Sequence, residues 1–123
     1  MQVKIIVLRT GEKLICGIAE LIDEEKQKGV CFVIKHPHVL SMIPTNEMDA
    51  EGNPCNYTVN FSKWIPYSSD VVFKIPYEAI VAIGEVEENI LNTYLAKYGK
   101  DINQDDDDME KSGIELPESL EEI

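Results

Sequence analysis

Residues 8–23 read LRTGEKLICGIAELID, in which two apolar segments flank a glycine turn. Gly11 supplies the positive φ that a tight turn between strands requires. The segment Lys13–Ile22 is a predicted strand that is apolar on both alternating faces, so we expect it to be buried on both sides or curled inside a barrel. A glycine inside a strand favours a sharp bend or a close backbone approach, which we expect at Gly17.

Further short β segments lie on both sides of this stretch. They are predicted over residues 2–8, 30–34 with an extension past Pro37 to Ile43, 57–62, 71–75 and 79–86. Charged or polar turns separate them, and residues 44–56 are expected to form a long polar loop. Because no strand–helix–strand alternation occurs, the sequence predicts a small all-β barrel or sandwich.

One helix and an acidic tail follow the strands. Apolar side chains at helical spacing predict an amphipathic helix over residues 87–100, with glutamates near its start and lysines near its end. Residues 101–123 carry ten acidic side chains and one lysine, so they hold a charge of −9 out of the −12 of the whole chain. We expect this tail to be disordered because its charges repel one another. The predicted barrel therefore spans residues 1–86.

Length and composition exclude several classes of protein. The chain has 123 residues, which is enough for one domain. Its pI of about 4.4 excludes a basic domain that binds nucleic acid mainly by neutralising phosphates. No stretch has the apolar length of a membrane span, and the start lacks a cleavage-site pattern, so neither a membrane partner nor a signal peptide is predicted. Three cysteines without CxxC spacing fit reduced thiols in a cytoplasmic protein.

The spacing of Leu8, Gly11, Gly17 and Asp23 resembles the first motif of the Sm and Sm-like proteins. In that motif a strand, a glycine turn and a second, bent strand lead into an acidic loop. Residues 73–83 partly resemble the second motif, and the chain is similar to Sm-like proteins found in phage genomes. The resemblance implies a strongly bent, five-stranded antiparallel barrel. The helix after the barrel would then cover one barrel end.

The resemblance also implies a homo-oligomeric ring, in which the fourth strand of one copy pairs with the fifth strand of its neighbour. A physical argument points the same way, because the apolar strands over 71–75 and 79–83 would otherwise leave edges open to aggregation. The alternative is that both are interior strands of a monomer. The predicted interface residues are Val71, Phe73, Ile75, Ile80, Val81 and Ile83.

Family members that bind RNA hold a base with an Asp and an Asn after the second strand and an Arg in the second motif. Here Asp23 matches the Asp, but the Asn position falls on Gln27 or Gly29, and Pro76-Tyr77 replaces the Arg-Gly pair. The residues left to bind nucleic acid are Asp23, Lys28 and Lys35 as polar and phosphate contacts and Tyr77 as a stacking face.

Two functions therefore stay open. RNA is a predicted partner that the missing Asn and Arg and the acidic tail both weaken. The alternative is a protein-interaction or assembly scaffold without nucleic-acid binding, in which the tail or the Trp64–Tyr67 segment engages a basic or aromatic partner. Trp64 and Tyr67 could equally form the outer edge of the core.

No catalytic constellation is recognisable. His36 and His38 could chelate a metal with Cys31 or Cys55, but no further ligands follow at a recognisable spacing, so we expect solvated loop histidines. The EF-hand-like start at Asp101 lacks the glycine and the glutamate that such a loop requires. The sequence predicts a non-enzyme with no metal and no cofactor.

Overall fold

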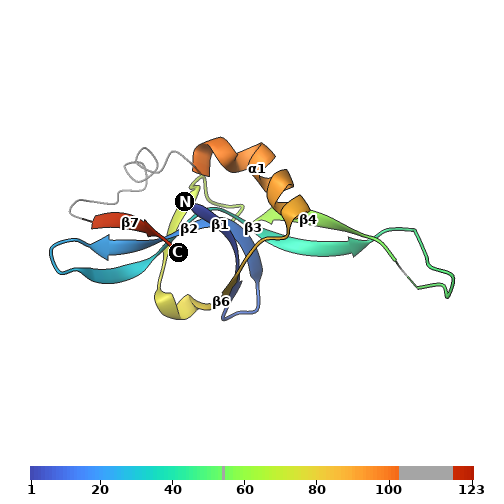
Figure 1. Cartoon of the computed structure of the whole chain (residues 1–123), viewed down its shortest axis with the longest axis horizontal. Helices are drawn as coiled ribbons and strands as arrows, with labels where there is room; N and C mark the ends of the chain where they lie inside the picture. The colour runs from blue at the N-terminus through green and yellow to red at the C-terminus, as the bar shows by residue number, and fades with distance from the viewer. Residues whose placement is uncertain (54, 103–117) are drawn as a thin grey trace.

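The computed structural model describes residues 1–53, 55–102 and 118–123, which form an antiparallel sheet with one helix on it (Figure 1). The strands are β1 (Gln2–Leu8), β2 (Lys13–Asp23), β3 (Lys28–Pro44), β4 (Tyr57–Lys63), β5 (Val72–Ile75), β6 (Ile80–Gly84) and β7 (Glu118–Glu122). A 3₁₀ turn, η1 (Tyr77–Ala79), joins β5 to β6, and α1 (Glu88–Ile102) follows β6.

The strands follow the order β4–β3–β2–β1–β6. The strand β5 pairs with β3 along the same edge as β4, and β7 pairs with the part of β2 that lies beyond β1. The predicted bent, antiparallel β fold with one helix after it is confirmed. The described residues hold seven strands instead of five, because β4 and β5 share one edge of β3 and β7 is added at the C-terminus.

A kink in the long strand β3 separates β4 from β5. His36 has a left-handed φ of 50°, and Pro37 has no backbone N–H to donate to a neighbouring strand. The backbone N–H of His36 donates to the Val71 carbonyl at 2.7 Å, and that of Trp64 donates to the Pro37 carbonyl at 3.2 Å. The connection from β4 to β5 is therefore fastened to the kink at both of its ends.

The strand β2 is buried on both faces, as its double apolar pattern predicts. Leu14, Cys16 and Ile18 belong to the barrel interior, whereas Ile15 packs under α1 with Tyr94. The two glycines behave as expected. Gly11 has a φ of 94°, and a Cβ on Gly17 would lie 2.9 Å from the side chain of Ile102, so the end of α1 approaches β2 closely.

The helix extends to Ile102, two residues past the predicted boundary. Ile102 is almost completely buried against β2, so the additional residues anchor an apolar side chain. At the other end the Glu87 carboxylate accepts hydrogen bonds from the backbone N–H groups of Asn89 and Ile90, which caps the helix. No helix in the described part of the chain is long and apolar enough to cross a membrane.

The acidic tail is predicted to be disordered, but both of its described ends belong to regular structure. Asp101 and Ile102 belong to α1, and residues 103–117 lie outside the described residues. Residues 118–122 form β7, which differs from the expected disorder. The reason is that Leu120 provides an apolar side chain which packs against the core beside β2, in a segment whose composition is otherwise acidic.

Candidate functional site

The turn between β2 and β3 holds two of the predicted nucleic-acid contacts. Asp23 and Lys28 are paired across the strands at the mouth of this turn. The Asp23 carboxylate accepts hydrogen bonds from the backbone N–H groups of Glu25 at 3.1 Å and Lys26 at 3.3 Å. Asp23 therefore shapes the turn, while Lys28 is exposed and lies beside it.

Tyr77, in η1, reaches the same end of the sheet. Its hydroxyl donates a hydrogen bond to the Glu20 carboxylate at 2.5 Å, and its ring meets Phe32 edge-on with centroids 5.0 Å apart. The hydroxyl also lies against Gly29, where a Cβ would collide with it. The hydrogen bond to Glu20 is the main reason that the pKa of Tyr77 is raised to about 12. Tyr77 is thus a partly exposed aromatic ring held by Glu20 and Phe32, with its hydroxyl against Gly29.

Lys35 lies apart from this cluster. It sits in the middle of β3, paired with Gly17 on one side and Val72 on the other, and its side chain is fully buried. A phosphate contact requires an ammonium group that solvent can reach. The structure therefore pairs Asp23 with Lys28, places Tyr77 against Gly29, the next residue along β3, and leaves Lys35 apart from them.

The predicted interface strands lie at the two outer edges of the sheet. Among the described residues, β5 pairs only with β3 and β6 only with β1. On β6, Val81 is 62% exposed and Ile83 is 37% exposed. Ile75 is instead buried in the barrel interior, and the other predicted interface residues, Val71, Phe73 and Ile80, are partly buried. Among the six predicted interface residues, the exposed apolar surface therefore lies on β6.

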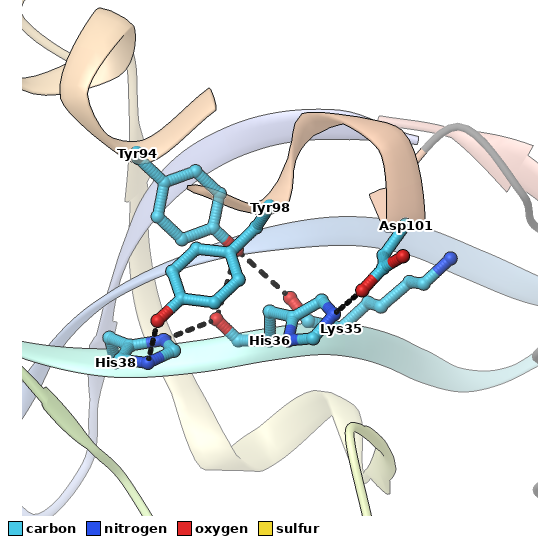
Figure 2. Close-up of polar contacts among 6 residues, drawn as sticks. All are labelled: Lys35, His36, His38, Tyr94, Tyr98 and Asp101. Carbon is cyan, nitrogen blue, oxygen red and sulfur yellow. Dashed lines mark hydrogen bonds and ion pairs between the residues drawn. The ribbon is translucent and has the colours of Figure 1, made fainter. Parts of the chain in front are cut away.

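The two histidines lie in β3, contrary to the expectation of solvated loop histidines, and form a polar cluster with α1 (Figure 2). The His38 Nδ1 atom lies 2.9 Å from the His36 carbonyl, and the Tyr98 hydroxyl lies 3.0 Å from His38 Nε2. Because a carbonyl can only accept, Nδ1 must carry a proton, and in the corresponding neutral tautomer Nε2 accepts from the Tyr98 hydroxyl. The Tyr94 hydroxyl lies 2.9 Å from the same His36 carbonyl and 3.3 Å from that of Lys35.

His36 joins the last turn of the helix to the kink. Its Nε2 atom lies 3.1 Å from an Asp101 carboxylate oxygen, and its ring stacks on Tyr98 with centroids 4.8 Å apart (Figure 2). Burial lowers the pKa of His36, and the nearby Asp101 carboxylate opposes that shift in part. The side chains of this cluster form hydrogen bonds with one another and with backbone carbonyls in the strained part of β3. The role of the cluster is therefore to fasten α1 to the sheet.

The described residues form no recognisable site for metal binding or thiol chemistry. In the described ranges, no group of three or more His, Cys, Asp or Glu side chains is arranged to hold a metal ion. None of the three cysteines, which all lie in the described ranges, forms a disulfide, and burial strongly raises the pKa of Cys16. Cys16 and the partly buried Cys31 pack as small apolar side chains.

The β3–β4 hairpin extends away from the barrel as an arm with one apolar face (Figure 1). Directly paired residues share a face, which here carries Leu40 with Phe61, Met42 with Val59 and Pro44 with Tyr57. The helix covers the first pair, but Met42 is 65% and Tyr57 is 51% exposed. A groove of about 390 Å³ runs between this face and the start of α1.

The Trp64–Tyr67 segment does not act as one aromatic patch. Trp64 packs against the barrel core, with its ring edge-on to Phe73 at 5.6 Å. Tyr67 is 96% exposed. The alternative in which these residues form the outer edge of the core therefore holds for Trp64 alone.

Sequence reasoning missed several residues of these sites. Glu20 and Phe32 hold Tyr77, although Glu20 is 57 residues away from it in the chain. The cluster around His38 draws Tyr98 from 60 residues away. No local signal points to such contacts, because the pattern of α1 predicts only that its apolar face is buried.

A bent antiparallel barrel with a glycine turn before a strand that is buried on both faces defines a class of small β-barrel proteins. A comparison with protein-family models agrees: the Sm_like domain matches residues 5–95, about three quarters of the chain. The chain belongs to the Sm-like family, whose members are generally non-catalytic proteins of RNA binding and assembly. No curated protein matches it.

Proposed function

We propose that this protein is a non-catalytic Sm-like protein whose copies assemble into a closed homo-oligomeric ring. The observation that carries the proposal is that β5 and β6 are each hydrogen-bonded on one side only among the described residues, as β4 and β7 are too. An unpaired strand edge with exposed apolar side chains, such as Val81 and Ile83, is a template for pairing with another chain. The absence of a disulfide among the three described cysteines is consistent with action in the reducing cytoplasm.

The two edges differ from one another, which decides the symmetry of the assembly. Pairing β5 of one copy with β6 of the next is a head-to-tail contact, and such contacts give a ring when the rotation closes. The strands have similar lengths, four residues in β5 and five in β6, so one can pair along almost the whole of the other. Val81 and Ile83 would become buried in this contact.

We further propose that the end of the sheet beside the β2–β3 turn binds single-stranded RNA weakly. Tyr77 offers a ring fixed by Glu20 and Phe32, on which a base can stack, and Lys28 offers a charge for a phosphate. Asp23 contributes by holding the turn. The nearby Glu20 carboxylate and the net charge of −12 oppose the approach of phosphates, so the expected affinity is low and falls with added salt.

The second candidate function is a protein-assembly scaffold that does not bind RNA. The exposed apolar face of the β3–β4 arm, with Met42 and Tyr57 beyond the reach of α1, favours it. Exposed apolar patches of this kind mark protein contacts more often than nucleic-acid contacts.

Two measurements on the full-length protein test these functions. Native mass spectrometry at micromolar concentration is expected to give one integral multiple of 13.9 kDa larger than a dimer, and a monomer would reject the ring. Filter binding with U-rich and A-rich oligonucleotides at low salt is expected to detect salt-sensitive retention. If neither oligonucleotide is retained, RNA binding is rejected and the scaffold function remains.

A further inference from the structure

The C-terminal strand β7 occupies an edge of β2 that no other strand among the described residues covers. It runs antiparallel to β2, from the pair Asp23–Glu118 to the pair Ala19–Glu122. On the same edge, β1 begins where β7 ends, because Gln2 pairs with Ile18. The Gln2 side-chain amide donates to the Glu122 carboxylate at 3.2 Å, so the two ends of the chain meet there.

One apolar side chain anchors this strand. Leu120 is paired with Leu21 and packs against the buried cluster of Leu21, Val33 and Val72. The remaining contact along the edge comes from backbone pairing over the five residues of β7. Such a mode of binding accepts many sequences, provided that an apolar residue occupies the position of Leu120.

The charges of β7 do not suit the edge that it occupies. Glu121 is directly opposite Glu20, and like charges directly opposite one another destabilise an antiparallel pair. Glu20 is already the acceptor for the Tyr77 hydroxyl, and Asp23 lies at the far end of the same edge. The edge is therefore acidic, and the strand that covers it is acidic as well.

We propose that the edge Ala19–Asp23 is a binding site for an extended basic segment of a partner protein, which replaces β7. The segment would place an apolar side chain where Leu120 lies and a lysine or arginine opposite Glu20. A polypeptide fits this edge because the edge offers backbone donors and acceptors, the apolar cluster of Leu21, Val33 and Val72, and carboxylates, the last of which repel phosphates. Because β7 stays tethered to the chain, it competes for the edge at a high local concentration. It therefore raises the concentration of partner that is needed for binding. The proposal does not depend on the ring.

Fluorescence anisotropy with three labelled peptides tests the proposal on the full-length protein. The first peptide has the sequence of residues 118–123, the second carries lysine at its three glutamate positions, and the third is the second with aspartate in place of its leucine. We expect the second to bind at least about tenfold more tightly than the other two. A Leu120→Asp variant should bind it more tightly still, because its own β7 no longer competes.

Two charge variants with the same change in net charge separate local pairing from general attraction. Glu20→Lys should reverse the preference, so that the acidic peptide binds better than the basic one. Glu24→Lys, in the turn beyond the edge, should keep the original preference.

Hydrogen exchange adds a readout of position, because the bound basic peptide should protect the amides of Ala19–Asp23 in the Leu120→Asp variant. Three results overturn the proposal: equal binding of the acidic and basic peptides, binding that does not need the leucine, or no binding to either protein. Protection elsewhere in the chain also overturns it. Subunit number is measured separately, so failure of the ring does not affect these outcomes.

Discussion

The Tyr94 hydroxyl is the group that ties α1 to the strained backbone of β3. It lies within hydrogen-bond distance of two carbonyls, those of Lys35 and His36, and the ring itself is fully buried. Burial strongly raises the pKa of this hydroxyl, so it stays protonated and donates at any ordinary pH.

We expect Tyr94→Phe to lower the free energy of unfolding by about 1–2 kcal/mol, because the packing remains but buried carbonyls lose a donor. Tyr94→Ala should cost about 3–5 kcal/mol, because it also leaves a cavity. Urea denaturation measures both. Equal losses for the two variants would contradict a separate contribution from the hydroxyl.

His36 should make stability depend on pH. Burial lowers its pKa in the folded state below the value of about 6.5 in the unfolded chain, although Asp101 opposes this shift and Lys35 and His38 add to it. As the pH falls through 6.5, the unfolded state therefore takes up a proton first and the free energy of unfolding decreases, by at most about 1.4 kcal/mol per pH unit.

The check is urea denaturation between pH 7.5 and pH 5.5 for the natural protein and for His36→Asn. Asparagine tolerates the left-handed φ at this position and does not titrate. The variant should show a flatter dependence over this range. If the free energy of unfolding depends on pH with the same slope in both proteins, a group other than His36 causes the dependence.

Tyr77 separates ring stacking from hydrogen bonding at the proposed RNA site. Tyr77→Phe keeps the ring and removes the bond to Glu20, whereas Tyr77→Ala removes both. Stacking of a base on an aromatic ring contributes about 1–3 kcal/mol, so Tyr77→Ala should weaken oligonucleotide binding about tenfold or more, with a much smaller loss for Tyr77→Phe. Filter binding at constant salt measures this, and unchanged retention by the alanine variant would contradict stacking.

At the scale of elements, the contact between the end of α1 and the middle of β2 depends on Gly17. A Cβ there would lie 2.9 Å from the Ile102 Cδ1 atom and 3.4 Å from the Met1 Sδ atom. Both are ends of flexible side chains, so Gly17→Ala should change stability little. Gly17→Val adds further bulk and should destabilise by about 1–3 kcal/mol, with faster hydrogen exchange in the last turn of α1.

A double-mutant cycle checks that Ile102 is the side chain responsible. In the Ile102→Ala background the additional cost of Gly17→Val should be smaller, because the space that valine needs is then available. If the losses of unfolding free energy in the two single variants simply add, the valine clashes with a side chain other than Ile102.

At the scale of the whole molecule, the ring depends on burying β6. Val81→Lys places a charge at every proposed subunit contact, and lysine on an edge strand is a known device against edge pairing. We expect each contact to weaken by about 2 kcal/mol, so native mass spectrometry should show loss of the ring in favour of smaller species. Met48→Lys makes the same change at another exposed apolar side chain, away from the outer strands, and should keep the subunit number. If both variants dissociate, the added charge would explain the loss of the ring, and not its position on β6.

The sequence by itself determined the fold class, the glycine turn at Gly11, the burial of β2 on both faces and the amphipathic helix. These follow from periodicity and local backbone preference, which neighbouring residues in the chain establish among themselves. The resemblance to the Sm-like family, carried by residues 8–23, belongs to the same local information and is confirmed by the family comparison.

Only the tertiary structure decided which predicted residues meet. It buried Lys35, brought Tyr77 to Glu20 and Phe32, placed the two histidines in a cluster under α1 instead of a loop, and placed Leu120 beside β2. Each of these contacts joins segments that are distant in the chain. Their partners are selected by the bend of the sheet and the register of its strands, which no local pattern of residue types encodes.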